Sequence, residues 1–196
     1  LDGATVKPVG QPYRDLLADL LAAPSLAALP LADAAQRPAE AKDGFNIEGL
    51  AAAPDGSLLI GVRNPVPAGR ALLVPLLNPA DLVEGRGPAK FGTPLRLDLG
   101  GRGVRDIERV GQGYLIVAGP TGDDGSFALY RWSGQAQQAP VQLPLDLGSL
   151  RPEALFAWPD GQLTLLSDDG GVNIGKQACK DADPSHRGFR SLDFKP

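Results

Sequence analysis

Acidic side chains recur at matching places along this chain, each shortly before a tight turn. Glu48 and Glu153 both precede the glycine of a Pro-Asp-Gly turn by eight positions, and the segment around Asp106 is a looser third copy. Carboxylate oxygens gathered at one place suit a hard cation such as Ca²⁺, which is bound by oxygen ligands. We therefore predict Glu48, Asp106 and Glu153 as metal ligands, with Ca²⁺ as the candidate cofactor.

Arginines and amides stand beside these carboxylates and favour a second kind of chemistry. A guanidinium neutralises a neighbouring carboxylate without metal, and it offers paired donors to an anionic ligand. The competing interpretation is structural, with each glutamate accepting backbone hydrogen bonds and locking one sheet to the next. The sequence points to no catalytic residue. The residues predicted to bind a ligand are Asn46, Arg63, Asn64, Arg105, Glu108, Arg151, Asp168 and Asp169.

Three repeats of strand, tight turn and strand carry these residues. The copies run over residues 46–61, 106–117 and 151–166, and the copy at 106–117 aligns Glu108 with Glu48 and Glu153. Further short strands are predicted at residues 71–76, 95–99, 127–132, 141–145 and 189–194. Four antiparallel strands in each repeat of this length are typical of a β-propeller blade.

The fold class that follows is all-β, a β-propeller of about three four-stranded blades and part of another. Residues 1–196 form a single incomplete domain: 1–44 end a preceding blade and add a small helical insertion, and the blades cover 45–100, 101–148 and 149–196. Residues 4–9 are predicted as an outer strand. Tyr13, Leu16, Leu17, Leu20 and Leu21 are spaced as on a helix that Pro24 ends.

The number of blades indicates that part of the ring is missing. Propellers close with about four to eight blades, and an open arc exposes the outer faces of both end blades. We expect the missing N-terminal blades to come from the same gene product or from a second chain. The absence of methionine, even at position 1, also favours a piece of a longer product. The alternative is a β-sandwich or meander that covers its ends with the helix.

Propeller geometry would bring the predicted residues together. First strands start, and second strands end, at the same face, so their ends surround one mouth. The glycine-rich segment 100–106 joins two blades on that face. It is interpreted either as a tight crossing or as a place where a ligand approaches the backbone.

Composition excludes several classes of partner. The formal net charge is -4 with both signs mixed along the chain, so nucleic acid is not expected. No apolar run reaches the ~18 residues of a membrane span. A single cysteine, Cys179, cannot form a disulfide within the chain. We expect a soluble protein of the bacterial cytoplasm or periplasm.

Residues 46–65, 100–120 and 151–170 resemble the bacterial family called domain of unknown function 3616. The similarity extends over nearly the whole chain, and members of that family look longer at the N-terminus. The resemblance implies that this chain is a C-terminal portion, and it brings no established activity. A looser similarity, in the Glu-Gly-Leu and Pro-Asp-Gly pattern, is to propeller lactonases and esterase-like phytases, which keep a cation at the channel mouth.

Three functions stay open on these grounds. The leading one is a propeller module that binds a small polar ligand or a divalent cation at its mouth. The first alternative is a metal-dependent hydrolase of lactones or phosphoesters, with Arg105 and Arg151 holding an anionic group. The second is a purely structural or protein-interaction propeller.

Overall fold

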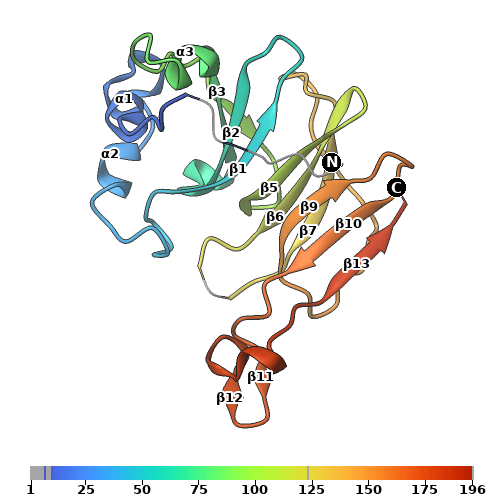
Figure 1. The fold of residues 1–196 in the computed structure, drawn as a ribbon. Helices are drawn as coiled ribbons and strands as arrows, with labels where there is room; N and C mark the ends of the chain where they lie inside the picture. Colours follow the sequence, from blue (N-terminus) through green and yellow to red (C-terminus); the bar gives the residue numbers. More distant parts are fainter. Residues whose placement is uncertain (1–6, 8–9, 123, 196) are drawn as a thin grey trace.

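The computed structural model describes residues 7, 10–122 and 124–195. The outer strand predicted at residues 4–9 falls mostly outside them. The described chain is mostly β, arranged as successive antiparallel sheets (Figure 1). The first sheet has the order β1-β2-β3-β4, with β1 (Asn46–Ala52), β2 (Leu58–Asn64), β3 (Ala71–Leu76) and β4 (Leu95–Leu97). The second has the order β5-β6-β7-β8, with β5 (Gly103–Val110), β6 (Gly113–Gly119), β7 (Ala128–Trp132) and β8 (Val141–Gln142).

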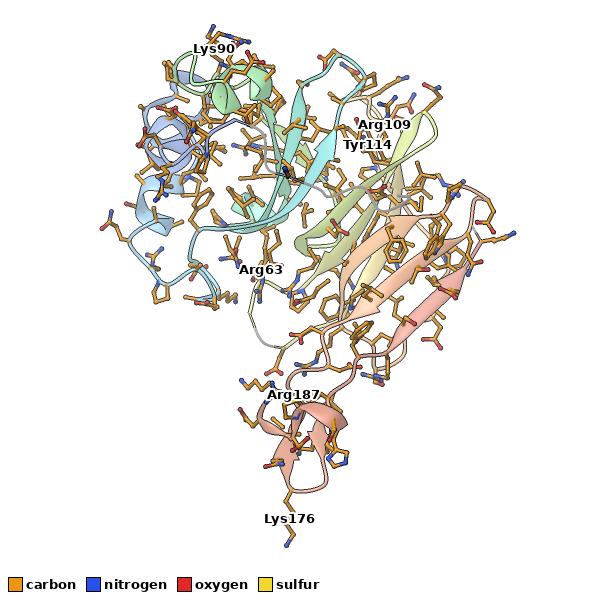
Figure 2. All side chains as sticks on the ribbon, viewed as in Figure 1. Arg63, Lys90, Arg109, Tyr114, Lys176 and Arg187 are labelled. Carbon is orange, nitrogen blue, oxygen red and sulfur yellow. The ribbon has the colours of Figure 1, made fainter. Side chains whose placement is uncertain are left out.

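The third sheet is smaller than predicted. It holds three strands in the order β13-β10-β9, formed by β9 (Pro152–Ala157), β10 (Leu163–Ser167) and β13 (Ser191–Phe194). The chain between β10 and β13 leaves the sheet as a projecting segment, residues 170–188. This segment carries the hairpin of β11 (Asn173–Ile174) and β12 (Gln177–Ala178), followed by 3-10 turns at Cys179–Asp181 and Pro184–His186. Lys176 lies at its tip, pointing away from the sheets (Figure 2).

Consecutive sheets pack face to face, with β5 beside β1 and β9 beside β5. Side chains alternate between the two faces of a strand, so the strands of the second sheet, such as β6, contribute to two separate cores. The core between the first and second sheets includes Leu73, Val104, Ile116 and Trp132. The core between the second and third sheets is built from fully buried leucines and a valine: Leu115, Val117, Leu129, Leu163 and Leu165.

The first two sheets approach closely because glycines face each other on β1 and β2. A Cβ atom at Gly61 would lie 2.6 Å from the Val104 Cγ1 atom, and one at Gly49 would lie 2.9 Å from the same atom. Any side chain there would separate β1 and β2 from β5. The two glycines therefore set the spacing of this junction.

Helices cover the outer face of the first sheet (Figure 1). They are α1 (Leu16–Ala22), a 3-10 turn at Pro24–Leu26, α2 (Leu31–Ala34) and α3 (Pro79–Val83). Leu20, Leu26 and Leu31 pack on Val62 and Leu72 of the sheet. The predicted helix ending before Pro24 is confirmed, but the expectation that both end sheets of the arc are exposed is wrong for the first sheet. Amphipathic helices bury the same apolar surface that another sheet would cover.

The outer face of the third sheet differs, because large apolar side chains remain exposed there. Trp158 is 50% exposed and Phe189 is 67% exposed. Phe156 packs edge-on against Trp158 with ring centroids 5.0 Å apart. No helix in the described part of the chain is both long and apolar enough to cross a membrane.

Candidate functional site

The first strand of each of the three larger sheets contains an irregularity at its start. The pairing of β1 with β2 skips Glu48, that of β5 with β6 skips Arg105, and that of β9 with β10 skips Glu153. The unpaired residue of a β-bulge bends the strand and redirects a side chain. Glu48, Arg105 and Glu153 are therefore equivalent positions of the three sheets.

This register corrects the alignment of the repeats. Glu108 pairs with Leu115 well inside the second sheet, so it is not the counterpart of Glu48. The counterpart is Arg105, three positions earlier. β5 is longer than β1, and its turn to β6 is shorter. Aligning Asn46-Ile47-Glu48 with Asp106-Ile107-Glu108 therefore places the second repeat three positions out of register. A sequence signal did exist, because eight positions separate Arg105 from Gly113 as they separate Glu48 from Gly56.

The three bulge residues and Arg63 form one ion cluster, which we call the mouth cluster: Glu48, Arg63, Arg105 and Glu153. Arg63 Nη1 lies 3.0 Å from Glu48 Oε1, and Arg105 Nε lies 2.8 Å from Glu48 Oε2. The Arg105 pair with Glu48 is an ion pair without the alignment of a directed hydrogen bond. Arg105 Nη2 pairs with Glu153 on its other side. One buried guanidinium thus joins carboxylates from the first and third sheets.

The same arginines hold the loop that follows β6. Arg63 Nε donates to the Pro120 carbonyl at 3.3 Å and Nη2 donates to the Gly122 carbonyl at 3.2 Å. Arg105 Nη1 donates to the Pro120 carbonyl at 3.4 Å, and its guanidinium carbon lies 5.7 Å from the centre of the Phe127 ring. The cluster therefore fixes one wall of the mouth as well as the junctions between sheets.

Two predicted residues have side chains engaged in local structure on the first sheet. Asn64 is fully buried, and its amide donates to the carbonyls of Ala39, Ala41 and Gly44 at 2.8–3.1 Å. Asn46 donates to Glu48 Oε1 at 3.0 Å and so supports the mouth cluster.

Asp106 links the second sheet to the third. Its carboxylate accepts hydrogen bonds from the backbone N–H groups of Ile107, at 2.8 Å, and Leu155, at 2.5 Å. Burial raises the pKa of Asp106, and these two hydrogen bonds oppose the rise. Burial, followed by the nearby Asp106 charge, also raises the pKa of Glu108. The hydrogen bond from the Leu155 N–H to Asp106 agrees with the locking interpretation for this carboxylate.

Asp169 and its neighbour Asp168 point to different surroundings. Arg190 donates to both Asp169 oxygens, from Nε at 2.8 Å and from Nη2 at 2.7 Å, and holds the pKa of Asp169 well below its usual range. This fork closes the base of the projecting segment. Asp168, in contrast, lines the open pocket described next.

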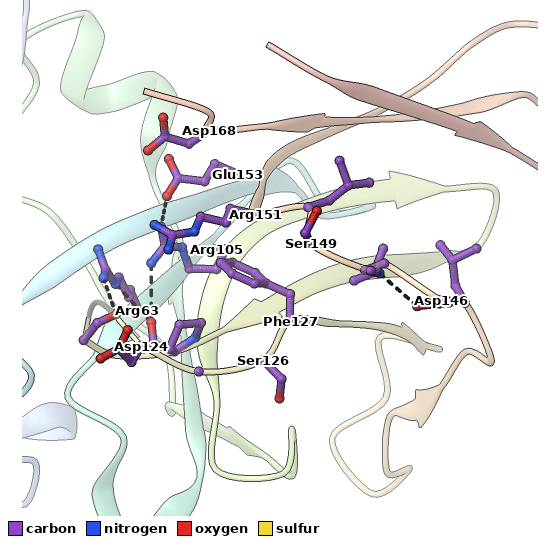
Figure 3. Close-up of a pocket in the computed structure, with 17 residues that line it drawn as sticks. Arg63, Arg105, Asp124, Ser126, Phe127, Asp146, Ser149, Arg151, Glu153 and Asp168 are labelled. Atoms are coloured by element: carbon purple, nitrogen blue, oxygen red, sulfur yellow. Dashed lines mark hydrogen bonds and ion pairs between the residues drawn. The ribbon is translucent and has the colours of Figure 1, made fainter. Parts of the chain in front are cut away.

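A cavity of about 630 Å³ opens between the second and third sheets, beside the mouth cluster (Figure 3). Arg105, Glu153 and Asp168 line it. It is also lined by residues 120, 122 and 124–127 of one loop and by residues 145–151 of another, which includes Ser149 and Arg151, and we call these two loop linings its walls. Among the described residues Arg151 makes no ion pair within 4.0 Å, and Glu153 is 40% exposed on its side chain. Charges of both signs thus remain available to a ligand.

The structure brings Arg63, Arg105, Arg151, Glu153 and Asp168 around this cavity. It does not bring the three predicted metal ligands together, since Asp106 bonds to Leu155 while Arg105 lies between Glu48 and Glu153. No group of three or more His, Cys, Asp or Glu side chains in the described chain is placed to hold a metal.

Both walls of the cavity contain residues that the repeat pattern did not single out. Asp124, Ser126 and Phe127 come from one loop, and Asp146 and Ser149 come from the other. The loops follow the second strand and the fourth strand of the second sheet, so only a defined strand order places them opposite each other. The sequence feature that could have indicated these residues is that both loops follow strands predicted to end at the mouth.

Comparison with known proteins identifies the family. Residues 14–161 match the model of the family described as "Protein of unknown function (DUF3616)". No curated protein matches the chain. The match spans most of the sequence, including the strands that carry Glu48, Arg63, Arg105 and Glu153, and the chain belongs to the DUF3616 family.

Proposed function

We propose that this chain is part of a β-propeller that binds a small polar ligand in the cavity between its second and third sheets. The observation that carries the proposal is the cavity itself, because it lies beside the fixed mouth cluster and is also lined by Arg151 and Asp168, which form no ion pair among the described residues. Polar groups converging on a preformed hollow are the usual mark of a ligand site.

The propeller interpretation is supported by repetition. Two four-stranded meanders and a third sheet follow one another, their first strands lie side by side, and the bulge recurs at the same end of each. Blades of propellers share this order and this convergence at one mouth.

Missing blades, from the same gene product or a second chain, would pack on the outer face of the third sheet, where Trp158 and Phe189 are exposed. The coding sequence upstream tests the same-product version. Further strand–turn–strand repeats are expected there, and an upstream sequence without them contradicts it.

Arg63 and Arg105 give the site rigidity and leave ligand contacts to others. Each nitrogen of both guanidinium groups faces a carboxylate or a carbonyl. Arg151 supplies the open guanidinium, and the fork of its N–H groups suits a carboxylate or phosphate oxygen pair. A polar ligand with an anionic group would therefore bind at Arg151.

Thermal shift and isothermal calorimetry test the proposal with a panel of small carboxylates, phosphates, amino acids and polyols. At least one compound is expected to bind, and Arg151→Gln should weaken that binding by about tenfold, the value of one lost charged contact. Arg96→Gln, at an exposed position of β4, is the matched control and should change nothing. Binding that is unaffected by Arg151→Gln would contradict the proposed site.

Calcium binding stays a separate prediction, and the same assay with Ca²⁺ tests it. A rise in melting temperature that Glu48→Ala and Glu153→Ala together remove would support it. Turnover of lactones or phosphoesters that a chelator abolishes would instead support the hydrolase alternative.

A further inference from the structure

The charges around the cavity restrict the ligand further than its polarity does. Arg151 and two carboxylates, Glu153 and Asp168, line the same part of the cavity (Figure 3). Their backbones are neighbours: the Asp168 N–H donates to the Arg151 carbonyl at 2.9 Å, and Glu153 follows Arg151 by two positions. Opposite charges therefore lie next to each other without forming an ion pair with Arg151 in the described chain.

Both carboxylates keep an oxygen available. Glu153 meets Arg105 through Oε1, and Asp168 accepts the Gly170 N–H through Oδ1 at 2.8 Å. Glu153 Oε2 and Asp168 Oδ2 have no hydrogen-bond partner among the described residues. The acceptor side of the cavity is therefore as open as its donor side.

We infer that the ligand is a zwitterion of the α-amino acid type, with its carboxylate on Arg151 and its ammonium group on Glu153 and Asp168. This inference rests on the proposed function. A dianion would place negative charge against both carboxylates, and a diamine would place positive charge against Arg151. A neutral polyol would cover charges of both signs without pairing either, which is costly once water is displaced. A zwitterion pairs all of them.

The dimensions of the cavity agree with this class. About 630 Å³ lies within the usual range for small-molecule sites, and it leaves room for a side chain beyond the charged end. That side chain would extend toward the loops 120–127 and 145–151, where Ser126 and Ser149 supply hydroxyl groups. A single amino acid or a short peptide fits the description.

The experiment uses calorimetry with the twenty amino acids, followed by two derivatives of the best binder. The N-acetyl derivative lacks the ammonium group, and the amide lacks the carboxylate. Each derivative is expected to bind at least about tenfold more weakly than the parent amino acid.

Two variants assign each charge to its partner. Arg151→Gln should remove the difference between the amino acid and its amide. Asp168→Asn, which keeps an acceptor for the Gly170 N–H, should reduce the difference between the amino acid and its N-acetyl derivative. Arg96→Gln should preserve both differences, and circular dichroism checks that each variant is folded.

The outcomes separate this inference from the proposed function. Binding of some other polar compound through Arg151, with none of the amino acids bound, overturns the zwitterion and leaves the site intact. An amino acid whose amide binds equally well also overturns it. Absence of binding by every compound in the panel overturns both.

Discussion

The two junctions between sheets meet at the same mouth, yet one is closed and the other is open. At the first junction Glu48 has a side chain only 22% exposed and is bound by Arg63, Arg105 and Asn46. At the second junction the side chain of the equivalent Glu153 is 40% exposed, and Arg105 is its one charged partner among the described residues, beside a cavity. The two glutamates occupy equivalent backbone positions, but Glu48 has two arginine partners and Glu153 has one. This difference separates the closed junction from the open one.

The two junctions also differ in the side chain that each first strand directs toward the next sheet. Gly49 and Asp106 occupy equivalent positions, one residue after each bulge. Glycine lets β1 approach Val104 closely, whereas the Asp106 side chain bridges from β5 to the Leu155 N–H of β9. The first junction therefore relies on the absence of a side chain at this position, and the second has a polar side chain that satisfies a backbone group.

Arg105→Met should have the largest effect, because Arg105 joins both junctions. Its loss leaves Glu48 paired with Arg63 and leaves Glu153 without an ion-pair partner among the described residues. Breaking a buried pair costs about 3 to 5 kcal/mol. Urea denaturation measures the change in the free energy of unfolding, with exposed Arg96→Met as the control. A loss similar to that of the control would show that the cluster does not hold the sheets together.

The two glutamates should differ when each is replaced by glutamine. Glu48→Gln is expected to cost about 2 kcal/mol, since two buried charged contacts are weakened. Glu153→Gln should cost less than about 1 kcal/mol, as exposed ion pairs do. The same denaturation experiment compares them directly. Equal costs would remove the distinction between a closed and an open junction.

Asp106→Asn should have the smallest effect, and one that depends on pH. The pKa of Asp106 is raised by burial, so ionisation in the folded state is unfavourable. The wild type should lose stability as the pH rises from the ordinary value of 3.8 through the raised pKa. The variant lacks this loss, so its stability relative to wild type should improve with pH. Urea denaturation at about pH 4 and about pH 7 measures it, with exposed Asp33→Asn as the control.

Much of the fold could be predicted because short apolar runs between Gly and Pro turns mark strands. Residues 71–76 were predicted as a strand and form β3, and the helix ends before Pro24 as expected. The proximity of Arg63, Arg105 and Glu153 was predicted from the ends at which propeller strands start and finish. These three residues do line one cavity.

Other features could not be predicted from residue types. A bulge leaves no mark in composition, so Glu108 was aligned where Arg105 belongs. The helices of residues 16–34 cover the first sheet because their apolar side chains pack on it. The sequence shows that these side chains are apolar, but not which surface they pack against. Asp168 lines the cavity, whereas Asp169 binds Arg190. This difference depends on the direction in which the projecting segment leaves β10.

The bulges have a consequence for how such a protein can change. A residue that the ladder skips contributes no cross-strand pair, so its replacement leaves the neighbouring pairs and the cores behind them in register. Positions 48, 105 and 153 already hold glutamate, arginine and glutamate on the same backbone. Selection, or a designer, could exchange the charges at these three positions as a matched set, because the ion pairs among them would re-form while the strand register stays constant.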